Sequence, residues 1–162
     1  SWRGYSLSGG KPTEDGLYKD AKTAVNFLLN KGILEQDIIL YGESLGTAVA
    51  VEIGQNKDFA GIILEAPFTS MIELGQKYYP FFPVKFLLKD KYESVKKIKN
   101  LKSPLLVMHG KKDKIVPFYM GEKIFNMGNN PKFKYFTDMD DHMMNFDEEL
   151  INEIDLFISS LN

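Results

Sequence analysis

One short stretch places a serine where it could act as a nucleophile. Gly42-Glu43-Ser44-Leu45-Gly46 has the G-x-S-x-G spacing, which is typical of a sharp turn from a strand into a helix. The glycines leave room for the turn, and the turn holds the serine in strained geometry above the sheet. It also aims the backbone N–H of Leu45, at the helix N-terminus, toward the oxyanion of an acyl transfer. We therefore expect Ser44 as nucleophile and Leu45 as one oxyanion-hole donor, the alternative being a serine that only completes a turn.

A serine hydroxyl becomes an effective nucleophile when a base takes its proton, and histidine suits this role because its pKa lies near neutral pH. The chain contains two histidines. His142 follows the last predicted strand and is the expected base, the alternative being a surface loop residue. His109 ends a buried apolar run before Gly110, where a packed, hydrogen-bonded histidine is the commoner arrangement.

Asp113 is the expected acid that orients the histidine, although an aspartate just past a strand end can also be a solvated turn residue. Ser44, Asp113 and His142 each follow the carboxyl end of a different predicted parallel strand. Those ends line the ligand crevice in open α/β sheets, so we expect the three side chains to converge. Glu65 also follows a strand and is the runner-up acid.

An acidic cluster precedes His142. Asp138, Asp140 and Asp141 are too close to this histidine in sequence to approach its Nδ1 atom easily. The cluster could suggest a metal site, but its spacing matches neither an EF-hand nor a zinc site. We expect no metal and no cofactor.

Composition excludes several classes of protein. The 162 residues are 44% hydrophobic, which is enough for the core of a single domain. The absence of cysteine removes thiol nucleophiles, disulfides and Cys-based zinc sites. Twenty Lys and Arg against 22 Asp and Glu give a net charge of -2 without a long block of one sign, so nucleic acid is not an expected partner. No apolar run approaches the roughly 20 residues that span a bilayer, and the first residues do not resemble a signal peptide.

Helices and strands alternate in the predicted order of elements. Apolar residues at helical spacing predict a helix from Thr13 to Asn30, with Thr13 as its cap. A short β-rich run follows at 38–41, and a helix rich in small residues begins after Ser44. A last helix carries Leu150, Ile154, Phe157 and Leu161 on one stripe.

The remaining strand patterns indicate a parallel sheet. Residues 61–64 and 105–108 are continuous apolar runs, as expected for central strands that helices cover on both faces. Residues 132–136 alternate at first, as a strand near a sheet edge does. The sequence therefore predicts an α/β fold with a doubly wound, mainly parallel sheet of about four strands.

The segment at about 68–103 is too long for an ordinary connection. It carries Tyr78-Tyr79-Pro80-Phe81-Phe82-Pro83 and then a lysine-rich stretch from Lys89 to Lys102. We expect a cap over the site, the alternative being a helical hairpin that only completes the core. A third interpretation has the apolar stretch, with its lysines, resting on an anionic membrane surface.

Several stretches of the sequence together resemble one known family. The match extends over nearly the whole chain, and the stretches that carry it are Arg3-Gly4-Tyr5, Gly10-Lys11-Pro12-Thr13-Glu14, Gly16-Leu17-Tyr18-Lys19-Asp20-Ala21, Ile39-Leu40-Tyr41-Gly42-Glu43-Ser44-Leu45-Gly46, Leu64-Glu65-Ala66-Pro67-Phe68-Thr69-Ser70, Leu88-Lys89-Asp90-Lys91-Tyr92 and His109-Gly110 with Asp113 and Ile115-Val116-Pro117. They resemble the α/β-hydrolase-domain serine hydrolases related to eukaryotic protein depalmitoylases.

The resemblance implies roles for three residues. By it Ser44, Asp113 and His142 take the nucleophile, acid and base positions, in the chain order that is usual for this fold. One departure lies in Met139-Asp140-Asp141-His142-Met143-Met144, because relatives usually have a glycine shortly before the histidine and Asn-Asp after it.

The resemblance also implies that the first strands of the fold are absent from this chain. Arg3-Gly4-Tyr5 resembles the segment that closes the fourth strand, so the upstream His-Gly loop with the second oxyanion N–H would precede it. The strand at 38–41 would then be an exposed apolar edge. We hypothesise that the natural protein is longer and that, if this chain folds alone, self-association through this edge covers it.

These expectations point to a serine hydrolase that cleaves a carboxylic ester or thioester through a Ser-His-Asp triad and an acyl-enzyme. Ser44 would attack the carbonyl, His142 would move the proton, and Asp113 would fix the imidazole tautomer. The aromatic cap suggests an apolar acyl group on the ester substrate. The alternative is a non-catalytic binding or scaffold protein, or an inactive fragment, that retains the fold.

Overall fold

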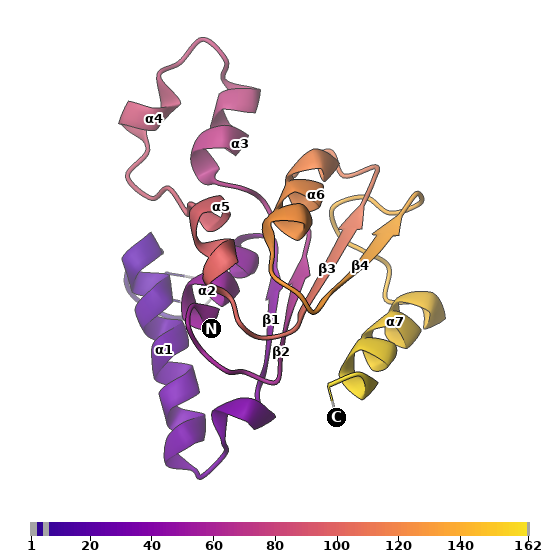
Figure 1. The fold of residues 1–162 in the computed structure, drawn as a ribbon. Coiled ribbons are helices and arrows are strands. Elements are labelled where there is room, and N and C mark those ends of the chain that lie inside the picture. The colour runs from indigo at the N-terminus through magenta and orange to yellow at the C-terminus, as the bar shows by residue number, and fades with distance from the viewer. Residues whose placement is uncertain (1–2, 5–6, 162) are drawn as a thin grey trace.

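The computed structural model describes residues 3–4 and 7–161, arranged around one sheet (Figure 1). Its four strands are β1 (Ile39–Glu43), β2 (Gly61–Glu65), β3 (Leu105–Gly110) and β4 (Lys132–Thr137). They lie in the order β1-β2-β3-β4, and every neighbouring pair is parallel. The predicted parallel α/β sheet is confirmed. The expectation about the first residues of the chain lies partly outside the described residues, and so does the resemblance at Tyr5.

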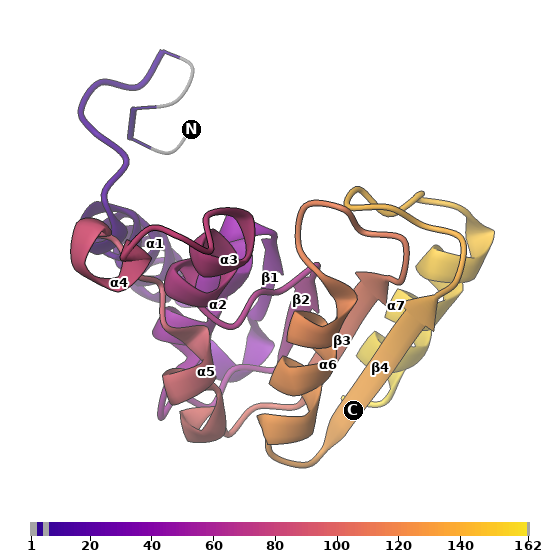
Figure 2. The ribbon, with the colours of Figure 1, turned by 90° about the horizontal axis from the view of Figure 1, so that it is seen from above.

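Helices cover both faces of this sheet (Figures 1 and 2). On one face lie α1 (Glu14–Asn30), α2 (Leu45–Gly54), α5 (Ser94–Lys97) with the 3₁₀ turn η2 (Ile98–Asn100), and α6 (Phe118–Met127); a further 3₁₀ turn, η1 (Glu35–Asp37), precedes β1. On the other face lies α7 (Glu148–Ser159). No helix of the described residues has both the length and the apolar composition that crossing a membrane requires.

The side chains of the central strands alternate between two cores. Leu64 and Val107 pack with residues of α2, η2 and α6, whereas Ile63 and Leu106 pack with residues of α7. All residues of β2 and β3 are buried, as their continuous apolar runs predict. β4 is half-exposed and lies at one edge, which confirms the edge position predicted from its alternation.

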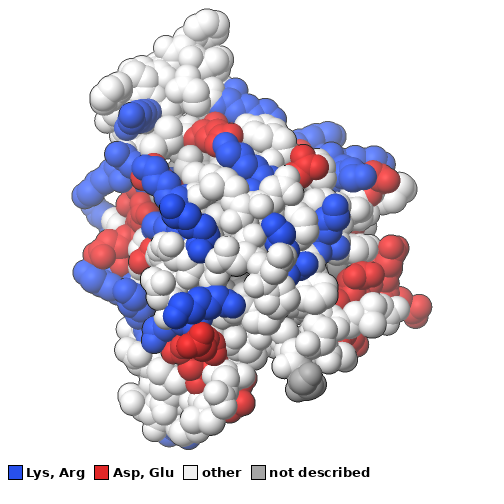
Figure 3. Space-filling view, viewed as in Figure 1, with Lys and Arg blue, Asp and Glu red and all other residues white. Residues whose placement is uncertain are grey.

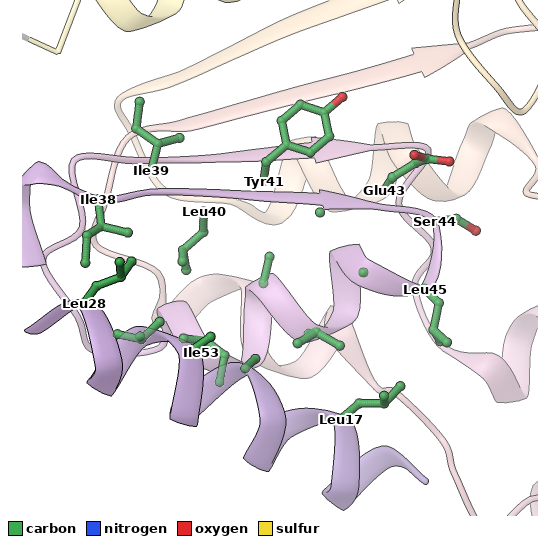
Figure 4. A pocket seen from close by; sticks show the side chains of 17 residues that line it. Leu17, Leu28, Ile38, Ile39, Leu40, Tyr41, Glu43, Ser44, Leu45 and Ile53 are labelled. Carbon is green, nitrogen blue, oxygen red and sulfur yellow. The ribbon is translucent and has the colours of Figure 1, made fainter. Parts of the chain in front are cut away.

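The strand β1 forms the other edge of the described sheet. It pairs with β2 on one side, and within the described residues no strand pairs with its other side. A groove of about 660 Å³ follows this open edge between β1, α1 and α2, and its lining includes Leu17, Leu28 and Leu40 (Figure 4). Pairing of this edge with another molecule stays a prediction.

The segment at 68–103 consists of two different parts. The helices α3 (Met71–Tyr78) and α4 (Val84–Leu87) form a hairpin that projects from the body of the molecule (Figure 1). The later part lies against the sheet, where Ile98 and Leu101 are buried in the core. The later part thus completes the core, and a role of the hairpin as a cap stays a prediction.

Glu14, at the start of α1, fastens the chain that follows the hairpin. Its Oε2 atom accepts hydrogen bonds from the backbone N–H groups of Lys91 (2.7 Å) and Tyr92 (3.0 Å). In return, its own N–H donates to Asp90 Oδ1 at 2.9 Å. Burial alone raises the pKa of Glu14, but hydrogen bonds, including these two, outweigh it and leave the pKa below its ordinary value. The segment that follows the hairpin is therefore held to the N-terminal end of α1.

We predict that Glu14→Ala lowers the free energy of unfolding by about 1–3 kcal/mol, because two backbone N–H groups lose their acceptor. Glu14→Gln keeps one oxygen acceptor and should lose less. Urea unfolding at neutral pH measures both changes. Glu122→Ala, on the exposed side of α6, is the matched control and should stay within about 0.5 kcal/mol of the wild type. Equal midpoints for Glu14→Ala and this control would contradict the prediction.

Candidate active site

Ser44 lies in the turn between β1 and α2, at the carboxyl end of the sheet (Figure 4). Its φ of 48° and ψ of -113° place a residue with a side chain in a rarely occupied region of backbone space. Its N–H donates to the carbonyl of Glu65 at 2.9 Å, and its carbonyl accepts from the N–H of Thr47 at 3.0 Å. Bonds on both sides thus hold the strained turn in place.

The two glycines of the motif have different roles. A Cβ at Gly42 would lie 2.4 Å from the backbone oxygen of Gly46, so the turn requires a glycine at position 42. Apart from its chain neighbours and the backbone of its own helix, a Cβ at Gly46 would meet no described atom within 4 Å, because this residue lines the open groove beside β1. The expected need for space is confirmed at Gly42, and at Gly46 it stays a prediction.

The structure brings the three predicted residues together. His142 Nε2 lies 3.0 Å from Ser44 Oγ, and His142 Nδ1 lies 2.9 Å from Asp113 Oδ2. The histidine is 98 residues from the serine and 29 from the aspartate, so the contacts depend on the sheet, which brings three strand ends to one edge. With its proton on Nδ1, donated to the carboxylate, the ring leaves Nε2 to accept the proton of the serine hydroxyl.

Asp113 has a donor on every side of its carboxylate. Oδ1 accepts from the N–H groups of Ile115 and Val116, both at 2.8 Å, while Oδ2 faces His142 and His109. Burial alone raises the pKa of Asp113, but the hydrogen bonds from the two histidines and the two N–H groups outweigh it and lower the pKa to about 2. The carboxylate is therefore negatively charged near neutral pH and can stabilise a protonated His142.

His109 is a second imidazole on the same carboxylate. It is fully buried, and its Nε2 lies 3.0 Å from the carbonyl of Val116 and 3.2 Å from Asp113 Oδ2. A Cβ at Gly121 would lie 2.1 Å from its Nδ1, which has no hydrogen-bond partner in the described part of the chain. The prediction of a packed histidine is confirmed. The bond to Asp113 was missed, and the His-x-x-x-Asp spacing across the strand end was its signal in the sequence.

Glu65, the runner-up acid, is bonded elsewhere than to the ring of His142. It is buried, its Oε2 accepts from the hydroxyl of Tyr41, and its Oε1 accepts from the N–H of Met144 at 3.3 Å. Burial raises the pKa of Glu65 more than these hydrogen bonds lower it. Glu65 thus holds the backbone just after His142, a positioning contact that the sequence analysis missed.

The acidic cluster before His142 makes contacts within its own region. Asp138 forms an ion pair with Lys111 at 2.7 Å, and Asp140 accepts from the side-chain amide of Asn145 at 2.8 Å. A Cβ at Gly110 would lie 2.3 Å from the carbonyl oxygen of Asp140, so the loops after β3 and β4 are in close contact here. These contacts fix the path of the loop that leads to the histidine.

Asp141 links the same two loops. Its Oδ1 accepts from the N–H of His142 at 2.8 Å and from the N–H of Lys114 at 3.1 Å. Across residues 3–4 and 7–161, the structure contains no group of three or more His, Asp or Glu side chains that could hold a metal ion. The acidic cluster therefore joins the loop after β4 to the loop after β3 in this structure.

Leu45 is the first residue of α2. Backbone N–H groups in the first turn of a helix have no carbonyl partner within the helix, so this one is suited to bind an anion. Ser44 and Leu45 also line the groove beside β1 (Figure 4). The role of Leu45 as an oxyanion donor stays a prediction.

A second cavity lies between the helices of the hairpin. Its volume is about 510 Å³, and its lining is apolar and aromatic, with Leu74, Phe82 and Leu88 among its walls. Ile115, two residues after Asp113, also lines it. The hydroxyl of Tyr78 lies 2.7 Å from the carbonyl of Ile115, so the C-terminal end of α3 is joined to the loop that carries Asp113.

Comparisons with known proteins match most of the chain. A family model described as the prolyl oligopeptidase family matches residues 4–155. An uncharacterised protein of Mycobacterium tuberculosis is 39% identical over 132 residues, which cover 81% of this chain and 47% of that protein. Human alpha/beta hydrolase domain-containing protein 17B is 33% identical over 135 residues, which cover 80% of this chain and 44% of that protein. The chain thus spans about half the length of these curated relatives.

Solved structures share the fold. An esterase from Pyrococcus furiosus superposes with a TM-score of 0.79 at 21% identity, covering 100% of this chain and 70% of that one. An alpha-beta hydrolase from Vibrio vulnificus gives a TM-score of 0.77 at 25% identity, covering 100% and 62%. Both likenesses extend over the sheet and the helices on its two faces.

We predict that Gly42→Ala lowers the free energy of unfolding by about 1–3 kcal/mol, because its Cβ would overlap the backbone of Gly46. Gly46→Ala is the matched control: its Cβ enters open space, and alanine favours a helix over glycine by up to about 1 kcal/mol. Urea unfolding compares the two variants. Equal loss of stability in both would show that the turn does not depend on space at Gly42.

A second prediction concerns the pH dependence of stability. Because the folded state raises the pKa of Glu65, the contribution of this residue is complete below the ordinary value of 4.5 and is lost as the pH rises through the folded pKa. Glu65→Gln cannot ionise, so the stability of the wild type relative to this variant should fall as the pH rises from 4.5. Urea unfolding over this range measures the difference, with Glu122→Gln as control. If the stability of the wild type minus that of Glu65→Gln stays constant or increases with pH, the pKa of Glu65 is not raised in the folded state.

Proposed function

The chain belongs to the prolyl oligopeptidase family of α/β-hydrolases, and from this premise we propose that it is a serine hydrolase that cleaves a carboxylic ester or thioester through an acyl-enzyme. The observation that carries the proposal is the position of His142, with Nε2 at 3.0 Å from Ser44 Oγ and Nδ1 at 2.9 Å from Asp113 Oδ2. A serine, an imidazole and a carboxylate in this order form the relay that acyl transfer requires.

In the proposed first step, Ser44 Oγ attacks the substrate carbonyl while His142 Nε2 accepts the hydroxyl proton. The carbonyl oxygen becomes an oxyanion, which the N–H of Leu45 stabilises. The charge of Asp113, whose pKa is lowered to about 2, stabilises the imidazolium next to it. His142 then gives the proton to the leaving alcohol or thiol, and the acyl group stays on Ser44.

In the proposed second step, water replaces the leaving group. His142 takes a proton from this water, the hydroxide attacks the acyl carbonyl, and the proton returns to Ser44 Oγ as the carboxylic acid leaves. The histidine must alternate between neutral and protonated forms without moving its ring. The bond of Nδ1 to Asp113, together with the contacts of Asp141 and Glu65 to the adjacent backbone, supports such a fixed ring.

The cavity in the hairpin is evidence that the acyl group of the substrate is apolar. Its apolar lining can pack against an alkyl chain and has few polar groups. One of its lining residues, Ile115, belongs to the loop that carries Asp113. Leu45 packs against the same hydrophobic core cluster as Met71 and Leu74, and these two residues line the cavity. An acyl chain in the cavity would therefore extend from the neighbourhood of the nucleophile.

We predict that Ser44→Ala and His142→Gln each lower the hydrolysis of a short p-nitrophenyl ester by at least about 10³-fold, because each removes an indispensable part of the relay. The release of p-nitrophenol measures turnover. Ser159→Ala, an exposed serine on α7, is the matched control and should keep the wild-type rate.

Two outcomes would count against the proposal. Wild-type turnover in Ser44→Ala would exclude this serine as the nucleophile. A folded wild type, verified by circular dichroism, that hydrolyses neither esters nor thioesters would favour the alternative of a non-catalytic binding protein.

A further inference from the structure

The end of the α3–α4 hairpin exposes a continuous group of large apolar side chains. Phe81 is 97% and Phe86 84% exposed, and Tyr79, Phe82 and Leu87 are more than half exposed. We refer to these five residues as the apolar tip. In Figure 3 the projection that corresponds to α3 and α4 is mostly white, with lysine atoms at its edge. Such a concentration of exposed rings marks an interaction surface.

The apolar tip is an ordered projection. The N–H of Tyr79 donates to the carbonyl of Gly75 at 2.8 Å, and the side-chain amide of Gln76 donates to the carbonyl of Pro80 at 2.8 Å. Val84 packs so closely on α3 that a Cβ at Gly75 would lie 2.8 Å from it. Because several polar backbone groups are already paired, the tip can leave water at a lower cost than an open loop.

Three exposed lysines lie close to the apolar tip in the sequence. Lys77, Lys85 and Lys89 are exposed, and residues 74–89 contain neither aspartate nor glutamate. Among the ion pairs of the described residues, none involves these three lysines. The hairpin thus combines exposed aromatic rings with uncompensated cations on one projection.

We propose that the hairpin docks the protein on the surface of an anionic lipid bilayer. The rings of the apolar tip would enter the boundary between headgroups and acyl chains, and the lysines would lie at the lipid phosphates. The three exposed lysines, without ion pairs within the described ranges, favour an anionic surface.

Docking would also place the lipid phase beside the candidate active site. Tyr78 joins the hairpin to the loop after Asp113, and the apolar cavity lies between the same two helices. If the proposed hydrolase function holds, an acyl chain could pass from the bilayer into this cavity. The docking itself requires no hydrolysis, so the two proposals can be tested separately.

The test is flotation of the protein with vesicles of phosphatidylcholine, with and without phosphatidylglycerol. The wild type should bind the anionic vesicles more tightly than the neutral ones, and added salt should weaken that binding. Phe81→Ser with Phe86→Ser should weaken binding to both kinds of vesicle by at least about tenfold, because the rings supply the apolar contact. Lys85→Glu with Lys89→Glu should weaken binding to the anionic vesicles alone, by at least about 25-fold.

Matched control variants change the same residue types on α1. Phe27→Ser and the pair Lys22→Glu with Lys31→Glu alter exposed residues away from the hairpin and should leave vesicle binding within about twofold of the wild type. All variants should keep the circular dichroism spectrum of the wild type. They should also keep its turnover of a soluble p-nitrophenyl ester, since none of the altered residues lines the cavity or contacts Ser44.

Three results would overturn the proposal. These are a wild type that does not float with anionic vesicles, hairpin variants that bind as the wild type does, and a wild-type dimer that Phe81→Ser with Phe86→Ser dissociates in sedimentation velocity. The last would assign the apolar tip to a second copy of this chain. Vesicle binding without ester turnover would contradict the proposed hydrolase function and leave the docking proposal intact.

Discussion

The carboxylate of Asp113 connects the loops on which the candidate active site depends. It accepts hydrogen bonds from two backbone N–H groups of its own loop and faces the rings of His109 and His142. One charged group thereby fixes the path of the loop after β3, the end of β3 itself and the orientation of the histidine after β4. Because it is buried, losing any of these donors would leave charge without compensation, and this makes the arrangement specific.

Ser44 lies in a strained turn, and neighbouring backbone groups hold this turn in place. Ser44 adopts a positive φ because the chain must turn from β1 into α2 within one residue, and Gly42 permits the close approach of the Gly46 carbonyl. The parallel pairing of β1 with β2 places the carbonyl of Glu65 where it accepts the N–H of Ser44. The side chain of that glutamate meanwhile holds the N–H of Met144, so the end of β2 supports both the serine turn and the histidine loop.

The sequence predicts the sheet and the three site residues because both depend on local patterns. Apolar runs identify the central strands, and G-x-S-x-G with a histidine and an aspartate after later strands identifies Ser44, His142 and Asp113. The sequence does not predict contacts that depend on the register of neighbouring strands. The contact of His109 with Asp113 and the contact of Glu65 with the histidine loop are of this kind. The division of residues 68–103 between core and hairpin likewise follows from packing that no single stretch of sequence records.

Peptide mapping by mass spectrometry after reaction with a fluorophosphonate tests directly whether His142 activates Ser44. Such reagents form a covalent bond to a serine oxygen only when a base activates it. We expect one adduct, on the peptide that contains Ser44, and we expect it to form much more slowly in His142→Gln. An adduct on another residue, or labelling of Ser44 at the same rate without the histidine, would contradict the claim that the two side chains act together.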